Sequence, residues 1–501
     1  MPMPSVFPTG TTIYDPEKCW NGYTLMPIKK VGAVLIDMNG NVVKVWKNFQ
    51  GFPNKLLPGG YVMGSLGIRD SNFSYQDQTD LTQLDWNGNV VWKFDHKDYI
   101  EDEGHEPRWM ARQHHDYQRE GNPVGYYVPG MECKTDSGNT LILCHTDTYN
   151  KRISDKRLLD DTIIEVDWEG NIVWEWHVSK HFNELGFSEA AKNVLFRNPN
   201  QHFTRTGEMS DWMHINSMST LGPNKWYDQG DERFHPDNII WDARESNIMA
   251  IISKETGKIV WKIGPDFTVS KELRAIGQII GQHHCHMIPK GLPGEGNILI
   301  FDNGGWAGYG LPDRMSKDGT KVDIRDHSRV LEINPVTLKL EWSFKGSDIK
   351  EGMMSIVENT TFYSQLISAA QRLPNGNTLI TEGCFSRLFE VTPEKEIVWE
   401  YRAPFDEIGH PMVYRAYRYP YSYVPQIDVP LHSLPCCWPH TKLSLRHCLG
   451  KYEVFQSAPQ AGDNVHMISL HITVFAKYRI MSIAWSLSLI TLSSTALSSH
   501  I

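Results

Sequence analysis

The chain has 501 residues, of which 40% are hydrophobic and 22% charged, the proportions of an ordinary globular protein. Its formal net charge of −10 argues against nucleic acid as a partner, because neutralising phosphates needs a basic face. A small anionic substrate stays compatible with this charge, since it responds to local charge.

The chain begins Met1-Pro-Met-Pro-Ser-Val-Phe-Pro, without the basic region and apolar run of a secretory signal. We therefore expect no N-terminal signal peptide and favour a cytoplasmic location. Residues 1–21 are interpreted as an N-terminal extension.

Six copies of one short pattern follow, each an apolar strand, a turn around Gly or Pro, and a strand ending in an aromatic residue. The copies cover residues 34–46, 81–92, 163–174, 251–261, 330–342 and 388–399. Asn39-Gly40, Asn87-Gly88 and Glu169-Gly170 supply the positive φ of tight hairpin turns. Repeats at this scale usually determine the whole architecture.

A second hairpin motif precedes most copies, as at Leu373-Pro-Asn-Gly-Asn-Thr-Leu-Ile380. Two hairpin motifs per repeat give about four strands, and six such sheets arranged radially form a β-propeller. We predict an all-β, six-bladed β-propeller over residues 22–427, with short helical insertions near 178–199 and 266–280. An open pair of sandwiches or a β-solenoid is the alternative.

Three further expectations follow from the repeats. The first copy is short, so residues from about 22 to 47 are expected to share a blade with the last repeat. The recurrent tryptophans are expected to pack between blades. Arg329 and Arg387, which precede the recurrent Glu332 and Glu390, are expected to form ion pairs between blades.

Residues 428–501 differ from the rest of the chain, with eight charged side chains in 74 positions and no repeat motif. We interpret this stretch as an atypical C-terminal tail: a disordered segment, a weak membrane or lipid-anchor signal, or an incorrectly spliced end of the gene model, of which we favour the last. Residues 480–499 are uncharged but rich in Ser and Thr, too polar for a membrane span, so a membrane is not an expected partner.

Histidines gather at one phase of the repeat, in the strand just before the second motif. Aligning the repeats superposes His114, His214 and His283. The innermost strands of a propeller line a central channel, so these imidazoles are expected to converge there. Converging imidazoles also suit zinc or copper. However, no carboxylate or thiolate except Cys285 shares their phase, and we expect no metal site.

Arg244 ends the predicted strand 238–244. A guanidinium at that place suits recognition of an oxyanion. The structural alternative is an ion pair with Asp242 or Glu245.

Several longer motifs together resemble the arylsulfotransferase family, the aryl-sulfate sulfotransferases that use no nucleotide donor. The resemblance runs from about residue 10 to 427, and its motifs are residues 12–18, 211–217, 225–228, 234–240, 281–283 and 301–305. It implies a six-bladed propeller that moves a sulfuryl group from a phenolic sulfate ester to an acceptor phenol. Transfer would be ping-pong, through a sulfated histidine and without a cofactor.

The resemblance also implies roles for particular residues. The family's nucleophilic histidine falls on His283, its Asp-Trp-x-His histidine on His214, and its arginine on Arg244. Another histidine falls within His114-His115, where the repeat phase favours His114. The neighbouring Asn216, His284 and His286 are expected to bind substrate. The implied partners are a small aryl sulfate donor and a phenol acceptor, and a homodimer is left open.

Two other readings of the sequence compete with a sulfotransferase. Propellers marked by tryptophans also host oxidoreductases that use a quinone cofactor or a metal. A non-catalytic propeller that binds a partner is the third.

Overall fold

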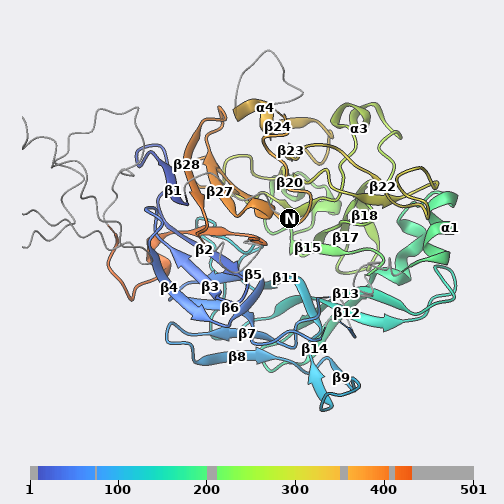
Figure 1. Ribbon diagram of the computed structural model, residues 1–501, viewed down its shortest axis with the longest axis horizontal. Helices are drawn as coiled ribbons and strands as arrows, with labels where there is room; N and C mark the ends of the chain where they lie inside the picture. Colours follow the sequence, from blue (N-terminus) through green and yellow to red (C-terminus); the bar gives the residue numbers. More distant parts are fainter. Residues whose placement is uncertain are drawn as a thin grey trace, which may run out of the picture. The chain divides into compact units, whose positions relative to one another are not determined.

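The computed structural model describes residues 9–70, 72–73, 76–199, 211–349, 359–404 and 412–430. Its strands form six antiparallel sheets around a common centre (Figure 1), which confirms the predicted six-bladed β-propeller. The first three blades, from the innermost strand outward, are β29 (Tyr417–Tyr419), β2 (Tyr23–Ile28), β3 (Gly32–Ile36) and β4 (Val42–Lys47); β5 (Gln50–Leu57), β6 (Tyr61–Ser65), β7 (Leu81–Leu84) and β8 (Val90–Phe94); and β11 (Gln113–Arg119), β12 (Thr140–Thr148), β13 (Leu158–Val166) and β14 (Ile172–His177).

The other three blades follow the same order. They are β15 (Ile215–Thr220), β16 (Ile239–Ala243), β17 (Ile248–Ile252) and β18 (Ile259–Ile263); β19 (His283–Met287), β20 (Ile298–Asp302), β23 (Arg329–Ile333) and β24 (Leu340–Lys345); and β25 (Ala369–Arg372), β26 (Thr378–Glu382), β27 (Arg387–Val391) and β28 (Ile397–Arg402). Strand β1 (Gly10–Tyr14) pairs with β28 and adds a fifth strand at the outer edge of the last blade.

The ring closes between the two ends of the repeat array. Strand β29, which follows the sixth repeat in sequence, pairs with β2 and so becomes the innermost strand of the first blade. The short first repeat therefore completes its blade with a strand from the other end of the propeller, but not with the last repeat as predicted, which forms a blade of its own. Radial closure leaves few unpaired strand edges, which protects β-proteins from association through their edges.

Tryptophan side chains join each blade to the next. In each case the indole Nε1–H donates to a carbonyl in the outer turn of the neighbouring blade. The pairs are Trp46–Asp85, Trp92–Trp168, Trp174–Lys254, Trp261–Pro335, Trp342–Pro393 and Trp399–Met38. The last pair joins the sixth blade to the first, so the hydrogen-bonded series runs around the whole ring. The prediction that the tryptophans pack between blades is confirmed.

The outer turns have a common local cause. In the turn between β3 and β4, the Asp37 carboxylate accepts hydrogen bonds from the backbone and the side-chain amide of Asn41, and Gly40 has φ +80°. The same Asp-x-x-Gly-Asn arrangement recurs at Asp85 and Asp167. A glycine in the left-handed region and an aspartate that bonds the chain two to four residues on are what such a turn needs.

The prediction for the arginines is wrong in its pairing. Arg329 and Arg387 form ion pairs within their own blades, with Asp302 and with Glu382 and Glu400 respectively. The recurrent glutamates instead accept arginines from the next blade, in the buried pairs Glu332–Arg372 and Glu390–Arg418. An arginine on the innermost strand can reach across the gap between blades, whereas one at the start of a middle strand faces its own sheet.

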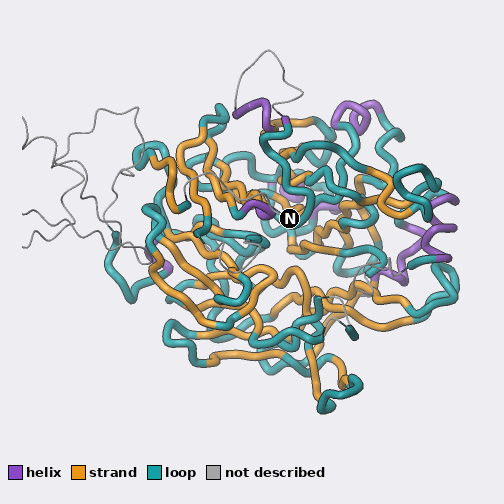
Figure 2. The backbone as a smooth tube through the Cα atoms, viewed as in Figure 1, coloured by secondary structure: helices purple, strands orange, loops and turns teal. Residues whose placement is uncertain are grey.

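The insertions lie at the edges of the sheets, where Figure 2 places most of the helical segments. They include two small hairpins, β9 (Asp98–Ile100) with β10 (Arg108–Met110) and β21 (Ala307–Tyr309) with β22 (Thr320–Asp323). The α-helices are α1 (Glu189–Arg197), α2 (Lys225–Asp228), α3 (Lys271–Ile276) and α4 (Gly346–Ile349); the 3-10 helices are η1 (Val178–Glu184), η2 (Glu232–Phe234), η3 (Gly383–Phe385) and η5 (Tyr421–Tyr423). Helix formation near 178–199 and 266–280 is confirmed.

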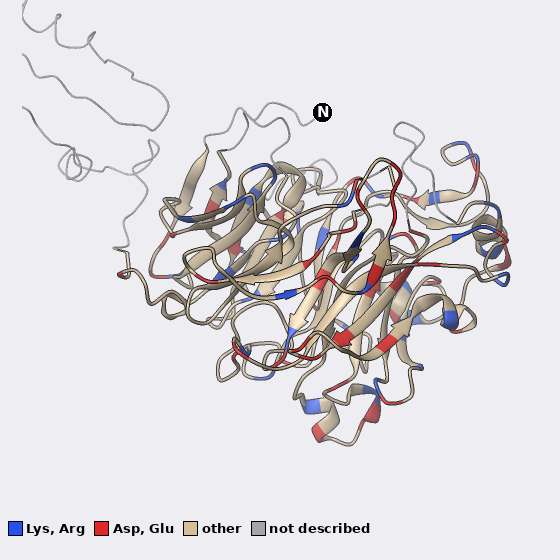
Figure 3. Ribbon diagram, turned by 90° about the horizontal axis from the view of Figure 1, so that it is seen from below, with Lys and Arg blue, Asp and Glu red and all other residues tan. Residues whose placement is uncertain are grey.

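Acidic and basic residues are interspersed along the described ribbon rather than separated onto two faces (Figure 3). Within the part of the chain that the structure describes, no helix is long and apolar enough to span a membrane. The five cysteines there are free thiols. Nearly all of the predicted C-terminal tail, from residue 431 on, lies outside the described residues.

Candidate active site

The histidines lie where the inner strands of three consecutive blades begin. His115 is in β11, His214 directly precedes β15, and His284 is in β19; their φ angles are 54°, 57° and 55°, in the left-handed region. The pairing of each strand with its neighbour shifts register at this point. Such bulges redirect side chains and are frequent next to active sites. Left-handed φ is costly for non-glycine residues and persists only where the surroundings enforce it.

His283 is held by the amide of Asn303. The Asn303 Nδ2 donates to the carbonyl oxygens of Ser364 and Ile367, each at 2.7 Å. Its Oδ1 must therefore accept at the other end, where His283 Nδ1 lies 2.7 Å away. The hydrogen-bond network thus assigns the proton of a neutral His283 to Nδ1 and leaves the lone pair on Nε2.

The charge state of His283 is set by burial and by a nearby arginine. Burial, followed by the positive charge of Arg244, holds the pKa of His283 well below its ordinary value near 6.5. The Arg244 guanidinium is paired with Glu245, and their side chains are 11% and 3% exposed. The predicted alternative, an ion pair with Glu245, therefore exists. The charge of Arg244 also lowers the pKa of His283, so the paired guanidinium still lies near that ring. Its position is therefore compatible with binding an oxyanion as well.

His214 of blade four and His115 of blade three contact each other. The Asp211 carboxylate accepts from Nδ1 of His214 at 2.8 Å, which leaves Nε2 as the ring atom that could contact a ligand. The rings of His115 and His214 are 4.5 Å apart in an edge-on arrangement. His214 also lies close enough to His283 to contribute to lowering its pKa. Histidines from blades three, four and five therefore share one buried region.

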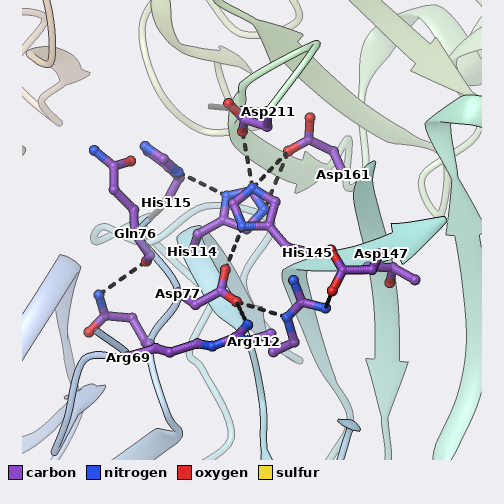
Figure 4. Close-up of polar contacts among 12 residues, drawn as sticks. Arg69, Gln76, Asp77, Arg112, His114, His115, His145, Asp147, Asp161 and Asp211 are labelled. Carbon is purple, nitrogen blue, oxygen red and sulfur yellow. Dashed lines mark hydrogen bonds and ion pairs between the residues drawn. The ribbon is translucent and has the colours of Figure 1, made fainter. Parts of the chain in front are cut away.

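His114 belongs to a second cluster, with His145 and Asp161, that Figure 4 shows. Its ring stacks on that of His145 with centroids 3.6 Å apart, and its Nε2 is 3.3 Å from Oδ1 of Asp161. Burial, followed by the charge of His145, holds the pKa of His114 well below its ordinary value. Burial and the neighbouring Asp211 raise the pKa of Asp161 well above its ordinary value.

A chain of charged groups extends from this cluster through His145 (Figure 4). His145 donates from Nε2 to Asp211 at 3.0 Å and from Nδ1 to Asp77 at 2.6 Å. Asp77 in turn accepts from Arg112 at 2.8 Å and from Arg69 at 3.1 Å. Burial alone would lower the pKa of His145, but its two carboxylate partners raise it to about 10. The Asp211 carboxylate thus connects His214 to a buried ionic network.

The three residues predicted to bind substrate have partners within the protein. His284 Nε2 is 3.1 Å from the hydroxyl of Tyr417, and His286 Nε2 is 2.8 Å from that of Tyr126. The Asn216 side chain donates to the carbonyl of Gln282 at 2.9 Å. The two histidines line a small cavity together with Lys55, Asp116, Ser217 and Tyr417. Substrate binding by these three residues stays a prediction.

The closing segment of the chain also reaches this region. Arg415, just before β29, donates to Oδ2 of Asp116 at 2.8 Å and to the carbonyl of Asn216 at 3.0 Å. The Tyr414 hydroxyl donates to the same Asn216 carbonyl at 3.0 Å, and its ring contacts that of His115. The segment that closes the propeller therefore also builds the wall of the site.

Sequence reasoning missed several residues that hold the site together: Asp211, His145, Asn303 and Arg415. A signal for two of them was present. His145, Arg244 and Asn303 each lie six residues after the asparagine of the second motif, at Asn139, Asn238 and Asn297. They are the same repeat position in three blades: Arg244 and Asn303 lie just beyond the second strand of their blades, and His145 lies within the longer β12. Arg415 belongs to no repeat copy, and no comparable pattern pointed to it.

The fold and the site together place the protein in one structural class: six-bladed propellers in which buried histidines from three blades converge. The sequence matches the family model for arylsulfotransferase (ASST) over residues 131–403, more than half of the chain. The chain belongs to the arylsulfotransferase family. Membership supports an aryl sulfotransferase activity and small-molecule aryl substrates.

The search of curated proteins found no match. Among solved structures, a protein of unknown function from Bacteroides caccae is 11% identical, with 79% of this chain and 98% of that one covered and a TM-score of 0.42. A streptogramin B lyase is also 11% identical, with coverages of 80% and 85% and a TM-score of 0.31. AztD from Citrobacter koseri is 8% identical, with coverages of 79% and 98% and a TM-score of 0.32. Likeness at this level carries no functional argument.

Proposed function

We propose that the protein transfers a sulfuryl group from a phenolic sulfate ester to an acceptor phenol through a sulfated His283, without a nucleotide donor. The observation that carries this proposal is the hydrogen bond from His283 Nδ1 to Asn303, whose own amide is fixed by two carbonyls. It orients the ring and reserves Nε2 for attack. The lowered pKa of His283 keeps that nitrogen unprotonated at neutral pH.

In the first half-reaction, Nε2 attacks the sulfur of the donor, the bond from sulfur to the phenolic oxygen breaks, and a phenolate leaves. The sulfated ring then carries a positive charge, which the Nδ1–H···Oδ1 bond to Asn303 partly offsets. In the second half-reaction, the oxygen of an acceptor phenol attacks the same sulfur. The bond between sulfur and Nε2 breaks, and neutral His283 is restored.

Negative charge on the sulfuryl oxygens must be stabilised during both half-reactions. Arg244 lies near His283, and Glu245 anchors its guanidinium. Positioned cationic donors in a water-poor site are the main means of stabilising such transfers. We assign this role to Arg244 and His214, with Asp211 orienting His214.

The acceptor phenol must lose a proton as it attacks. His115 is the candidate base, since its ring contacts that of His214 and burial keeps its pKa well below its ordinary value. The repeat phase favoured His114. However, His114 faces His145 and Asp161, so the contacts favour His115. A general base of this kind contributes about 10²–10⁴-fold in rate.

The test is mass spectrometry of the protein after brief incubation with 4-nitrophenyl sulfate. We expect one added sulfo group on the peptide that contains His283, and its loss when a phenol is then added. His283→Ala should abolish both the label and the release of 4-nitrophenol. His96→Ala, at a side chain 69% exposed, is the matched control and should keep both. Turnover by wild-type protein without a labelled histidine would refute the covalent mechanism.

A further inference from the structure

Behind His214, four buried side chains direct polar atoms toward one point (Figure 4). They are His114, His145, Asp161 and Asp211; each offers one ligand atom, and these atoms lie within 4.8 Å of one another. All four side chains are fully buried. Two of the atoms, Nε2 of His114 and Oδ1 of Asp161, form no hydrogen bond with any described residue. Buried polar atoms without a hydrogen-bond partner are rare and call for an explanation.

The spacing of the atoms suits a tetrahedral metal ion. Nε2 of His145 is 3.0 Å from Oδ2 of Asp211 and 3.9 Å from Oδ1 of Asp161, and His114 Nε2 is 3.3 Å from the same Oδ1. Ligands about 2.1 Å from a tetrahedral Zn²⁺ lie about 3.4 Å from one another. On binding, the ion would replace the proton that His145 Nε2 donates to Asp211. Two neutral imidazoles and two carboxylates would then balance the charge of a divalent ion, as burial of the cluster requires.

Each of the four residues is also held from its outer side. His145 Nδ1 donates to Asp77, and His114 Nδ1 lies 2.8 Å from His115 Nδ1. The outer oxygen of Asp161 accepts from the backbone N–H of Ile215, and that of Asp211 from His214. Metal-binding histidines characteristically donate their other N–H to a carboxylate, and ligating carboxylates are themselves hydrogen-bonded.

We propose that these four side chains form a binding site for a divalent transition-metal ion, for which Zn²⁺ is the probe. Four protein ligands without an open position are typical of a structural site. The ion would fix the Asp211 carboxylate, which also orients His214. That consequence for catalysis rests on the proposed function, whereas binding of the metal does not. The carboxylates come from β13 and from the loop before β15, so they share no repeat phase with the histidines.

The experiment compares metal content after expression in zinc-supplemented medium and dialysis against a weak chelator. Wild-type protein should retain about one zinc per chain. Asp161→Asn should lower retention at least about tenfold. Asp160→Asn is the matched control and should retain the metal, because Asp160 binds Ser179 and Trp212 instead. Wild-type protein expressed with Co²⁺ should show the visible absorption of a tetrahedral site.

The same experiment can also overturn the proposal. If His145 is only an imidazolium held between Asp77 and Asp211, wild-type protein will retain no more zinc than Asp161→Asn and will show no cobalt absorption, which overturns the proposal. Should Asp161→Asn fail to fold, the zinc content and cobalt spectrum of the wild type decide alone. Sulfation of His283 is measured separately, so loss of either result leaves the other interpretable.

Discussion

Asn303 shows how one amide can determine which ring nitrogen of a histidine reacts. Its two donor hydrogens are committed to backbone carbonyls, so only its oxygen remains for His283. An amide accepts a hydrogen bond without adding a negative charge. His283 therefore keeps a low pKa while its orientation is fixed.

Asn303→Asp should shift the pH profile of the reaction. A carboxylate at this position would raise the pKa of His283, which burial and Arg244 now lower. Protonation of Nε2 removes the nucleophile, so the acid limb of kcat/KM should move to higher pH, with less change at alkaline pH. The pH dependence of kcat/KM with 4-nitrophenyl sulfate measures this. An identical profile in the variant would contradict the role given to Asn303.

Asp242 should make the protein less stable as pH rises. Burial raises the pKa of this carboxyl to about 8, although Ser217 donates to it. A carboxyl whose pKa is raised in the folded state stabilises that state most at pH values below its ordinary pKa. Its contribution is then lost between about pH 4 and pH 8. Asp242→Asn should flatten this decline in the free energy of unfolding, measured by denaturant titration at both pH values. Asp237→Asn, at an exposed position, should keep the wild-type slope.

At the scale of strands and turns, the sequence predicted what is repeated and local. The Asp-x-x-Gly-Asn turns and the alternating apolar strands were recognisable, since short-range rules govern them. The bulges that open β11, β15 and β19 were not. The repeat alignment superposed His114, His214 and His283, whereas the histidines with left-handed φ are His115, His214 and His284. A bulge adds one residue to one strand only, and alignment of repeats by sequence alone does not register it.

The partners in the ion pairs between blades were likewise beyond the sequence pattern. Glu390 was recognisable as a recurrent residue, but its partner Arg418 comes from β29, outside all six repeats. The pairing depends on which strand lies innermost in the next blade. That is a property of the closed ring.

Glu390→Gln should therefore strongly destabilise the last blade. Arg418 is fully buried and also lies over the ring of Trp399, so the substitution would leave its charge unpaired. Breaking a buried ion pair costs about 3–5 kcal/mol. Asp228→Asn, which removes the exposed pair with Lys290, should cost less than about 1 kcal/mol. Denaturant unfolding monitored by tryptophan fluorescence compares the two, and equal losses would contradict this account.

At the scale of the whole molecule, the series of tryptophan hydrogen bonds is closed into a ring only by Trp399, which joins the sixth blade to the first. Trp399 is fully buried and donates to Met38 of the first blade at 2.8 Å. Trp399→Phe keeps an aromatic ring but removes the donor. It should cost about 1–3 kcal/mol. Trp342→Phe, whose hydrogen bond is exposed, should cost less. Thermal unfolding of the two variants gives the comparison, and the reverse ranking would argue against a special role for the closing contact.

Strand β29 has a consequence for biosynthesis. The innermost strand of the first blade is the last blade strand to leave the ribosome, so β2 must wait with an unpaired edge until nearly all of the propeller has been translated. Arg415 and Tyr414 arrive with that strand. A nascent chain therefore lacks both its final strand pairing and the contacts of Arg415 and Tyr414 until β29 has emerged, and the site should be complete only from that point.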